Sequence, residues 1–169
     1  MTNSTNAEPS SQLTTGIENA EGFRAHAYWD PIGQVWSVGY GQTGPDIGPN
    51  TVVTRKEATQ WLIGDETALT SQLFAALPWA VNLSSVRVGA LVDAAYNLGL
   101  NGLLQFATAL SAMKAENWKK AVSGFRASLW YAQVPDRVNT ICYMVLLNEW
   151  AEEYLTTDQM AALESAMNG

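Results

Sequence analysis

Residues 21–44 read EGFRAHAYWDPIGQVWSVGYGQTG, and expectations for the rest of the chain can be built outward from them. Residues 30–33, Asp-Pro-Ile-Gly, are a turn signature, with Asp opening the turn and Pro at its second position. Strand-like runs flank this turn at residues 23–28 and 34–40. The stretch therefore predicts a small β-hairpin.

Three polar residues of this stretch, Glu21, Asp30 and Ser37, would lie at one mouth of the hairpin. Two carboxylates across a cleft can hydrolyse a glycosidic bond. One donates a proton to the leaving oxygen, and the other acts on a water or on the sugar carbon. A strand hydroxyl could hold the water. The pattern alone has low specificity, because many hairpins contain Glu, Asp and Ser.

Before the hairpin, Ser10 or Ser11 can cap a first helix that runs to about Ala20. Gly22 is a plausible end for it, since glycine tolerates positive φ angles. Glu21 then lies in the last turn, where the negative end of the helix dipole disfavours a charged carboxylate. The alternative is an ordinary solvated glutamate at a helix end.

After the hairpin, Thr54 and Glu57 form a capping box that predicts a helix to about Leu77, which Pro78 follows. So long a helix could be a strut between two lobes. Beyond it the pattern is helical only. The further helices are expected to begin near Ser84 or Ser85, Leu103, Asn117, Ser128, Pro135 and Thr157. These features predict an α+β fold that is mostly α.

The 169 residues are 47% hydrophobic, enough for one well-buried domain or two tightly joined lobes. No apolar run approaches the ~20 residues of a membrane-spanning helix. Residues 1–12 are polar and carry no secretory signal, so we expect a disordered lead-in and synthesis in the cytoplasm. Cys142 and His26 are each the sole residue of their type, which excludes an internal disulfide and an unaided metal site. A catalytic thiol is possible, but the apolar surroundings favour a buried structural cysteine.

The net charge of −7 is unevenly distributed. Residues 149–169 hold five acids and no base, whereas all nine Lys and Arg lie before them. Nucleic acid is therefore an unexpected partner, since affinity for phosphates needs a basic surface. A direct ionic attachment to anionic membranes is unexpected for the same reason. The acidic tail is either a solvated helix packed on the outside or a contact for a partner or substrate.

The segment resembles the catalytic segment of the phage-type lysozymes, glycoside hydrolase family twenty-four. That family carries a Glu-Gly pair, an Asp nine residues after the Glu, and a Thr that opens a Thr-Ile/Val-Gly-Tyr/Ile-Gly run. Here these places hold Glu21-Gly22, Asp30 and residues 37–41, Ser-Val-Gly-Tyr-Gly. Later family motifs are resembled by residues 97–99 with Phe106, and by residues 128–137, Ser-Leu-Trp-Tyr-Ala-Gln-Val-Pro-Asp-Arg. The likeness covers roughly residues 16–150.

This resemblance implies a muramidase that cuts peptidoglycan glycan strands between N-acetylmuramic acid and N-acetylglucosamine, with inversion and without a cofactor. Glu21 would be the general acid, while Asp30 and Ser37 would position the attacking water. Supporting or substrate-contacting roles are implied for Arg137, Gln133, Tyr28, Gly39 and Phe106. The family pairs an arginine matching Arg137 with the catalytic glutamate, which also favours the charged form of that glutamate.

Two departures from the family concern the hydroxyl. Serine replaces threonine, which keeps the hydroxyl but loses the methyl group that restricts its rotamers. Six residues separate Asp30 from Ser37, where the family has five. Counting forward from Asp30 would select Trp36, whose indole cannot accept a hydrogen bond. Counting back from the glycine run selects Ser37, with the extra residue absorbed near Gly33-Gln34.

The resemblance implies a two-lobed lysozyme fold in a single domain over residues 13–169. It would comprise a hairpin lobe (about 17–53), an interlobe helix (55–77), a helical lobe (79–150) and an extra acidic helix (151–169). The expected role is a monomeric endolysin that is made in the host cytoplasm, needs a holin to reach the wall and does not insert into membranes. The alternatives are a lytic transglycosylase on the same fold and an inactive module that binds glycan or protein.

Overall fold

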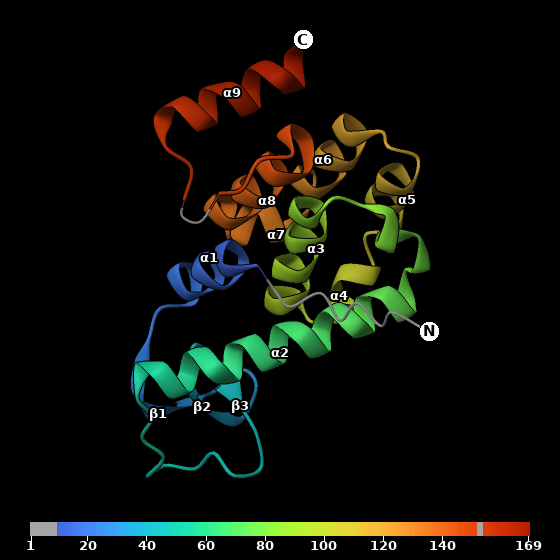
Figure 1. The fold of residues 1–169 in the computed structure, drawn as a ribbon. Helices are drawn as coiled ribbons and strands as arrows, with labels where there is room; N and C mark the ends of the chain where they lie inside the picture. The colour runs from blue at the N-terminus through green and yellow to red at the C-terminus, as the bar shows by residue number, and fades with distance from the viewer. Residues whose placement is uncertain (1–9, 152–153) are drawn as a thin grey trace.

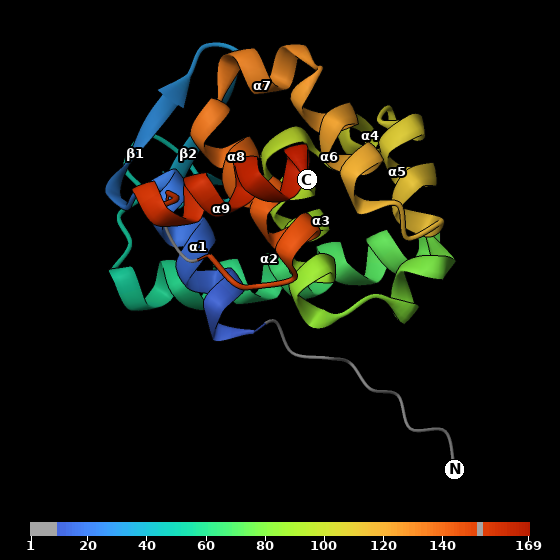
Figure 2. The same ribbon diagram turned by 90° about the horizontal axis from the view of Figure 1, so that it is seen from above.

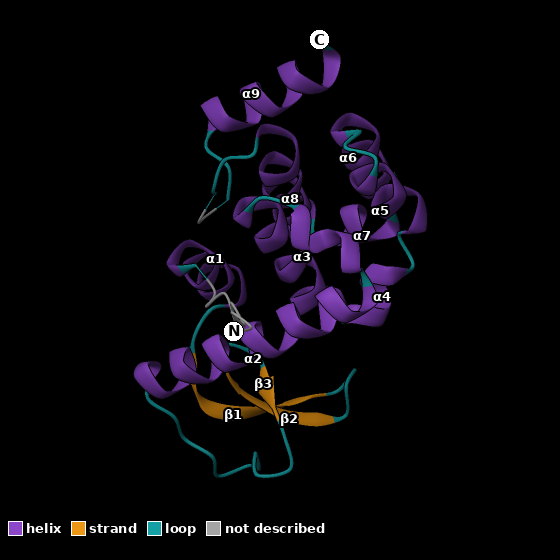
Figure 3. Cartoon of the chain, turned by 45° about the vertical axis from the view of Figure 1, so that its right-hand side comes forward, coloured by secondary structure: helices purple, strands orange, loops and turns teal. Residues whose placement is uncertain are grey.

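The computed structural model describes residues 10–151 and 154–169, and it shows a small antiparallel sheet and a larger helical region (Figure 1). Helix α2, Arg55–Ala76, connects the two parts. The strands lie beside its N-terminal half, and the helical region packs against one side of its C-terminal half (Figure 3). The predicted α+β, mostly helical, two-lobed lysozyme fold is confirmed.

Helix α1, Ser11–Glu21, enters the fold as expected. The Ser10 hydroxyl accepts a hydrogen bond from the backbone N–H of Leu13, and Gly22 ends the helix at φ 70°. Leu13 and Ile17 are buried against the rest of the molecule. Residues 1–9 lie outside the described part of the chain, but residues 11 and 12 already belong to α1, so the predicted lead-in extends too far.

Three strands form the sheet in the order β1-β2-β3: β1, Arg24–Asp30; β2, Val35–Gly39; and β3, Gln42–Thr43. The hairpin of β1 and β2 is confirmed, but β3 was not predicted, because two residues are too short for an alternating pattern. Gln42 turns its side-chain oxygen back to the Tyr40 N–H, at 2.7 Å, which closes the turn between β2 and β3. Tyr40 is completely buried beneath this turn.

The register of the β1-β2 hairpin shows which residues form its turn. Asp30 pairs with Val35 and Tyr28 pairs with Ser37, so residues 31–34 form the turn. Gln34, which the sequence pattern had placed in the second strand, lies in that turn at φ 52°. The pairing is irregular between Arg24 and Tyr28, where β1 bridges instead to the segment around residue 52.

Helix α2 has the capping box that its sequence predicts. The Thr54 hydroxyl accepts from the Glu57 N–H, and the Glu57 carboxylate accepts from the Thr54 N–H at 2.8 Å. Twenty-two residues at 1.5 Å per residue give a helix about 33 Å long. The short 3₁₀ helix η1, Pro78–Asn82, then redirects the chain into the helical region.

The helical region is built from α3, Ser85–Leu98; α4, Leu100–Leu104; α5, Ala107–Lys114; α6, Trp118–Arg126; α7, Leu129–Gln133; and α8, Pro135–Leu147. Helix α9, Thr157–Asn168, lies against α8 (Figure 2). Three predicted boundaries were wrong. Helix α8 stops short of Trp150, because Asn148 adopts a left-handed conformation, and α9 is capped by Thr156 rather than Thr157. The helical region expected from Leu103 begins earlier, at Leu100, and is divided into α4 and α5.

The core fills the space between these helices. Phe106, Phe125 and Trp130 form one aromatic cluster, with ring centroids 5.5 to 6.3 Å apart. Cys142 is completely buried nearby, and burial raises the pKa of its thiol to about 12, so it is the structural cysteine that was favoured. Within the described residues, none of the helices has the length and apolarity needed to cross a membrane.

Candidate active site

Glu21 is the last residue of α1, at the point where Gly22 turns the chain toward the sheet. Its Oε1 accepts a hydrogen bond from Nη1 of Arg137 at 2.5 Å, and its side chain is 24% exposed. A Cβ on Gly41 would lie 3.8 Å from Oε2, so the turn after β2 approaches the other oxygen. The carboxyl group thus touches both parts of the fold while staying accessible to solvent.

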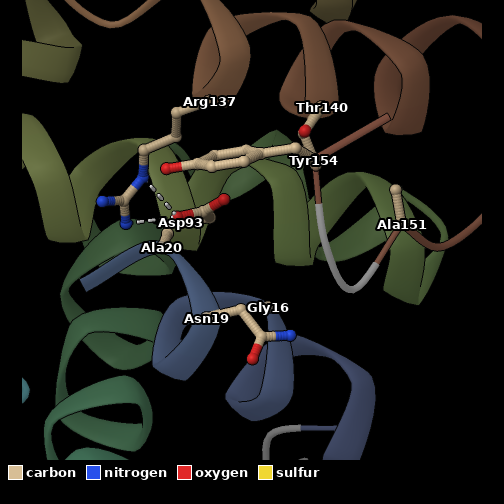
Figure 4. Close-up of a pocket in the computed structure, with 8 residues that line it drawn as sticks. All are labelled: Gly16, Asn19, Ala20, Asp93, Arg137, Thr140, Ala151 and Tyr154. Atoms are coloured by element: carbon tan, nitrogen blue, oxygen red, sulfur yellow. Dashed lines mark hydrogen bonds and ion pairs between the residues drawn. The ribbon is translucent and has the colours of Figure 1, made fainter. Parts of the chain in front are cut away.

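Arg137 lies in the first turn of α8 and is almost entirely buried. It donates to Asp93 of α3 through Nε at 3.0 Å and Nη2 at 2.6 Å, and to Glu21 through Nη1 (Figure 4 shows the Asp93 contacts). Burial acts to lower the pKa of Arg137, but the charges and hydrogen bonds of Asp93 and Glu21 outweigh it and raise the pKa. The guanidinium therefore stays charged and joins α1, α3 and α8.

A cavity of about 310 Å³ opens beside Glu21. Its polar lining comes from the side chains of two acids and four other residues: Glu21, Asp136, Arg137, Asn97, Gln133 and Tyr154. Such a recess, with an acid at its wall and amides around it, can receive a polar ligand such as part of a sugar ring.

A second cavity of about 290 Å³ lies against α1 and shares Arg137 and Tyr154 with the first. Figure 4 shows the Tyr154 ring crossing this space, with its hydroxyl pointing toward Arg137. Asn19 and Thr140 line this second cavity but not the first. Ala20, Arg137 and Tyr154 line both recesses.

Asp30 ends β1 and is engaged with its own turn. Its Oδ1 accepts from the Ile32 N–H at 2.9 Å, and a Cβ on Gly33 would lie 2.8 Å from Oδ2. Glycine at position 33 therefore leaves room for the carboxylate to fold over the turn. Ser37 lies opposite Tyr28 in the sheet and is 4% exposed. The contacts of the described residues bring Glu21 together with Arg137, but they do not join Asp30 or Ser37 to Glu21.

The remaining predicted residues fall into different surroundings. Gln133 lines the cavity beside Glu21. Tyr28 stacks beneath the guanidinium of Arg24, with 4.3 Å from its Cζ to the ring centroid. Gly39 has φ 68°, and a Cβ there would lie 2.9 Å from that of Ala58, so it allows the sheet to approach α2. Phe106 packs into the aromatic cluster of the core.

Three polar residues at this site were missed by the sequence interpretation: Asp93, Asn97 as a cavity residue, and Tyr154. A signal for Asp93 was present, because it is an acid inside the otherwise apolar run of residues 88–96 on α3. An acid on a buried helix face requires a cationic partner. Identifying Arg137 as that partner needs the tertiary structure, because the two residues are 44 positions apart.

Comparison with known proteins gives a consistent result. The family described as phage lysozyme matches residues 18–138, more than two thirds of the chain, and this range includes both Glu21 and Arg137. The chain is 29% identical over 167 residues to the pre-baseplate central spike protein Gp5 of Enterobacteria phage T4, an alignment that covers 84% of this chain and 29% of that protein.

Two further relatives have names that refer to the cell wall or to lysis. The peptidoglycan hydrolase gp36 of Pseudomonas phage phiKMV is 31% identical, over 69% of this chain and 13% of that protein. The endolysin of Bacillus phage PZA is 33% identical, over 62% of this chain and 44% of that protein. The chain thus spans less than half the length of each of these relatives. Because the family match includes the end of α1, the whole sheet, α2 and the first turn of α8, the chain belongs to the phage lysozyme family.

Proposed function

We propose that this protein is a muramidase that hydrolyses the β-1,4 bond between N-acetylmuramic acid and N-acetylglucosamine in bacterial peptidoglycan, with inversion. The observation that carries the proposal is the placement of Glu21. It is an acid at the wall of a cavity, oriented by a buried arginine, in a chain of the phage lysozyme family.

Glu21 is proposed as the general acid. Cleavage of a glycosidic bond needs a proton on the leaving oxygen, and a carboxylic acid held in one orientation can deliver it. The bond from Arg137 fixes the orientation of Glu21, and the partial exposure of its side chain makes it accessible to a substrate. Inversion would require a water to attack the opposite face of the sugar.

Asp30 and Ser37 are proposed to position that water. Both lie on the β1-β2 hairpin, and the register places Ser37 opposite Tyr28, two residues before Asp30. The fold of the Asp30 carboxylate over its own turn holds it in one conformation. Gln133, beside Glu21 in the cavity, is proposed to contact the sugar. Phe106 packs in the core, which favours a supporting structural role for Phe106.

Digestion of purified Gram-negative peptidoglycan by the wild type and by Glu21→Gln tests the activity. General acid catalysis contributes ~10²–10⁴ in rate, so the variant should release almost no muropeptides. Glu18→Gln is the matched control, because it makes the same change one turn earlier in α1 and should keep near-wild-type release.

The chemical nature of the released ends separates the alternatives. Muramic acid ends that borohydride can reduce support hydrolysis, whereas anhydro ends would mean a lytic transglycosylase. Release by Glu21→Gln at the wild-type rate would refute the assigned acid. No release by any of the three proteins would favour a module that binds glycan without cleaving it.

For the biological role we propose an endolysin that reaches the wall from the host cytoplasm through a holin lesion, in line with the names of two relatives. The likeness to a central spike protein supports a second candidate, wall penetration at infection. Mass spectrometry of purified virions distinguishes them. The protein should be absent from virions and present in lysates if it is an endolysin, and abundant in virions if it belongs to the infection apparatus.

A further inference from the structure

The proposed role of Glu21 contains an electrostatic conflict. A general acid must carry its proton at the working pH, yet an arginine at hydrogen-bond distance favours the ionised carboxylate. Glu21 accepts from Arg137 at 2.5 Å. Something in the surroundings has to offset this positive charge if Glu21 is to donate a proton.

The geometry of Arg137 identifies the compensating group. Asp93 accepts two of the three hydrogen bonds that the guanidinium makes to carboxylates, through Nε and Nη2, and Glu21 accepts one. The side chains of Asp93 and Arg137 are 9% and 7% exposed, whereas that of Glu21 is 24% exposed. The Arg137–Asp93 pair, in which Nε and Nη2 both donate to Oδ1, is therefore the better shielded of the two, and its mutual attraction is screened less by water.

We propose that Asp93 is a positioning residue for the reaction, which neutralises Arg137 so that the guanidinium orients Glu21 without holding it in its ionised form. The inference rests on the proposed function of Glu21 as general acid. Asp93 acts through Arg137 and does not touch the substrate.

Charge counting gives the direction of the effect. With Asp93 ionised, the three side chains are neutral together when Glu21 is protonated and carry one negative charge when it is ionised. With a neutral residue at position 93, they carry one positive charge when Glu21 is protonated and none when it is ionised. Because a net charge in a poorly solvated site is costly, Asp93 favours the protonated form of Glu21.

Two further titratable groups interact electrostatically with members of this cluster, Glu66 on α2 with Asp93, and Tyr96 on α3 with Glu21 and Arg137. Glu18 on α1 and Asp65 on α2 interact in turn with Glu66, and Asp136 precedes Arg137 on α8. None of these groups is a base, so among them Arg137 is the sole cation, and Asp93 is the acid that donor groups of Arg137 contact besides Glu21.

The first test is a pH profile of kcat/KM for Asp93→Asn, which keeps the shape of the side chain but removes its charge. The fall in activity on the alkaline side should move to lower pH by about one unit or more, a tenfold or greater change in the proton affinity of the essential acid. The maximal value of kcat/KM should change by a smaller factor than the proton affinity of the essential acid. Asp93→Glu restores the charge and should return the alkaline limb toward its wild-type position.

The control is Asp46→Asn, an equal change of charge at an exposed loop position away from Arg137. Its profile should coincide with that of the wild type. An unmoved alkaline limb in Asp93→Asn, with a lower maximum only, would overturn the proposal and leave Asp93 a purely structural partner of Arg137.

Carbon-13 NMR of the side-chain carboxyls gives a second test that needs neither activity nor a variant. In the wild type Asp93 must lose its proton at a lower pH than Glu21, and ionisation of Glu21 first would overturn the inference. Because this titration is independent of cleavage, a protein that fails to digest peptidoglycan would refute the proposed function without deciding the role of Asp93.

Discussion

Replacing Glu66 by Gln should stabilise the folded protein at alkaline pH and change its stability little at acid pH. Glu66 lies on α2 and is completely buried. Its Oε2 accepts from the Thr14 hydroxyl at 2.8 Å, but its Oε1 has no hydrogen-bond partner among the residues that the structure describes. Burial raises the pKa of the Glu66 carboxyl to about 7, against a lowering effect of the Thr14 bond, and the charges of Glu18, Asp93 and Asp65 raise it further.

The sign and size of the effect follow from proton linkage. In the unfolded chain this carboxyl has its ordinary pKa of 4.5, so between 4.5 and about 7 the folded state binds a proton that the unfolded state does not. Stability therefore falls as the pH rises through this window, and the loss is complete above about pH 7. Each tenfold change in proton affinity is worth ~1.4 kcal/mol, so the full loss is about 3 kcal/mol. The glutamine variant has no such proton and escapes the loss.

Urea unfolding of the wild type and Glu66→Gln at about pH 5, 6, 7 and 8 measures this. The difference in unfolding free energy should shift in favour of the variant by about 3 kcal/mol between pH 5 and pH 8. Glu57→Gln, on the same helix, is the control. The bond from the Thr54 hydroxyl lowers the pKa of Glu57. The contribution of the ionised Glu57 carboxylate to folding stability is therefore complete above its usual pKa and stays constant over this range. If the difference in unfolding free energy between the wild type and Glu66→Gln is equally constant over this range, the reasoning is refuted.

Three further predictions concern packing, reactivity and capping. Gly89→Ala should lower the melting temperature by several degrees, because its Cβ would overlap the ring of Trp150 and overpacking costs about 1–3 kcal/mol; an unchanged transition in calorimetry would contradict this. Cys142 should resist iodoacetamide at about pH 8 in the native protein and react in denaturant, as mass spectrometry can show; equal labelling in both would exclude the buried thiol. Thr54→Ala should cost ~1 kcal/mol in urea unfolding, because the N–H of Glu57 loses its acceptor, and Thr54→Ser should recover most of it.

Much of the fold was predictable because its signals are local. The capping box at Thr54, the cap at Ser84 and the glycine at position 22 each fix one end of a helix through a side-chain or backbone preference that the sequence displays. The boundary after Leu147 was not predictable, since the apolar pattern continues to Trp150. The chain leaves the helix at Asn148, whose side chain accepts from the Ser84 hydroxyl, a contact that depends on tertiary structure.

The site was predictable only as a set of residue types. The family motif located Glu21 and its arginine partner, and the structure joins them. The family motif does not include Asp93 or Glu66. Asp93 is visible as an acid in an apolar run, whereas Glu66 lies among polar neighbours, and the partners of both are across the fold. The positions proposed for Asp30 and Ser37 depend on a substrate and a water, so they remain predictions.

The bond between Glu21 and Arg137 spans 116 residues of chain, and it has a consequence for synthesis of the protein. Helix α1 is made first, but it docks onto α2 and α3, and its acid is oriented by a side chain of α8. At ~5–20 residues per second, several seconds pass on the ribosome between the emergence of the glutamate and that of its arginine. A nascent chain therefore holds its acid without an orienting partner until α8 has been translated, and a product truncated before α8 would lack an assembled site.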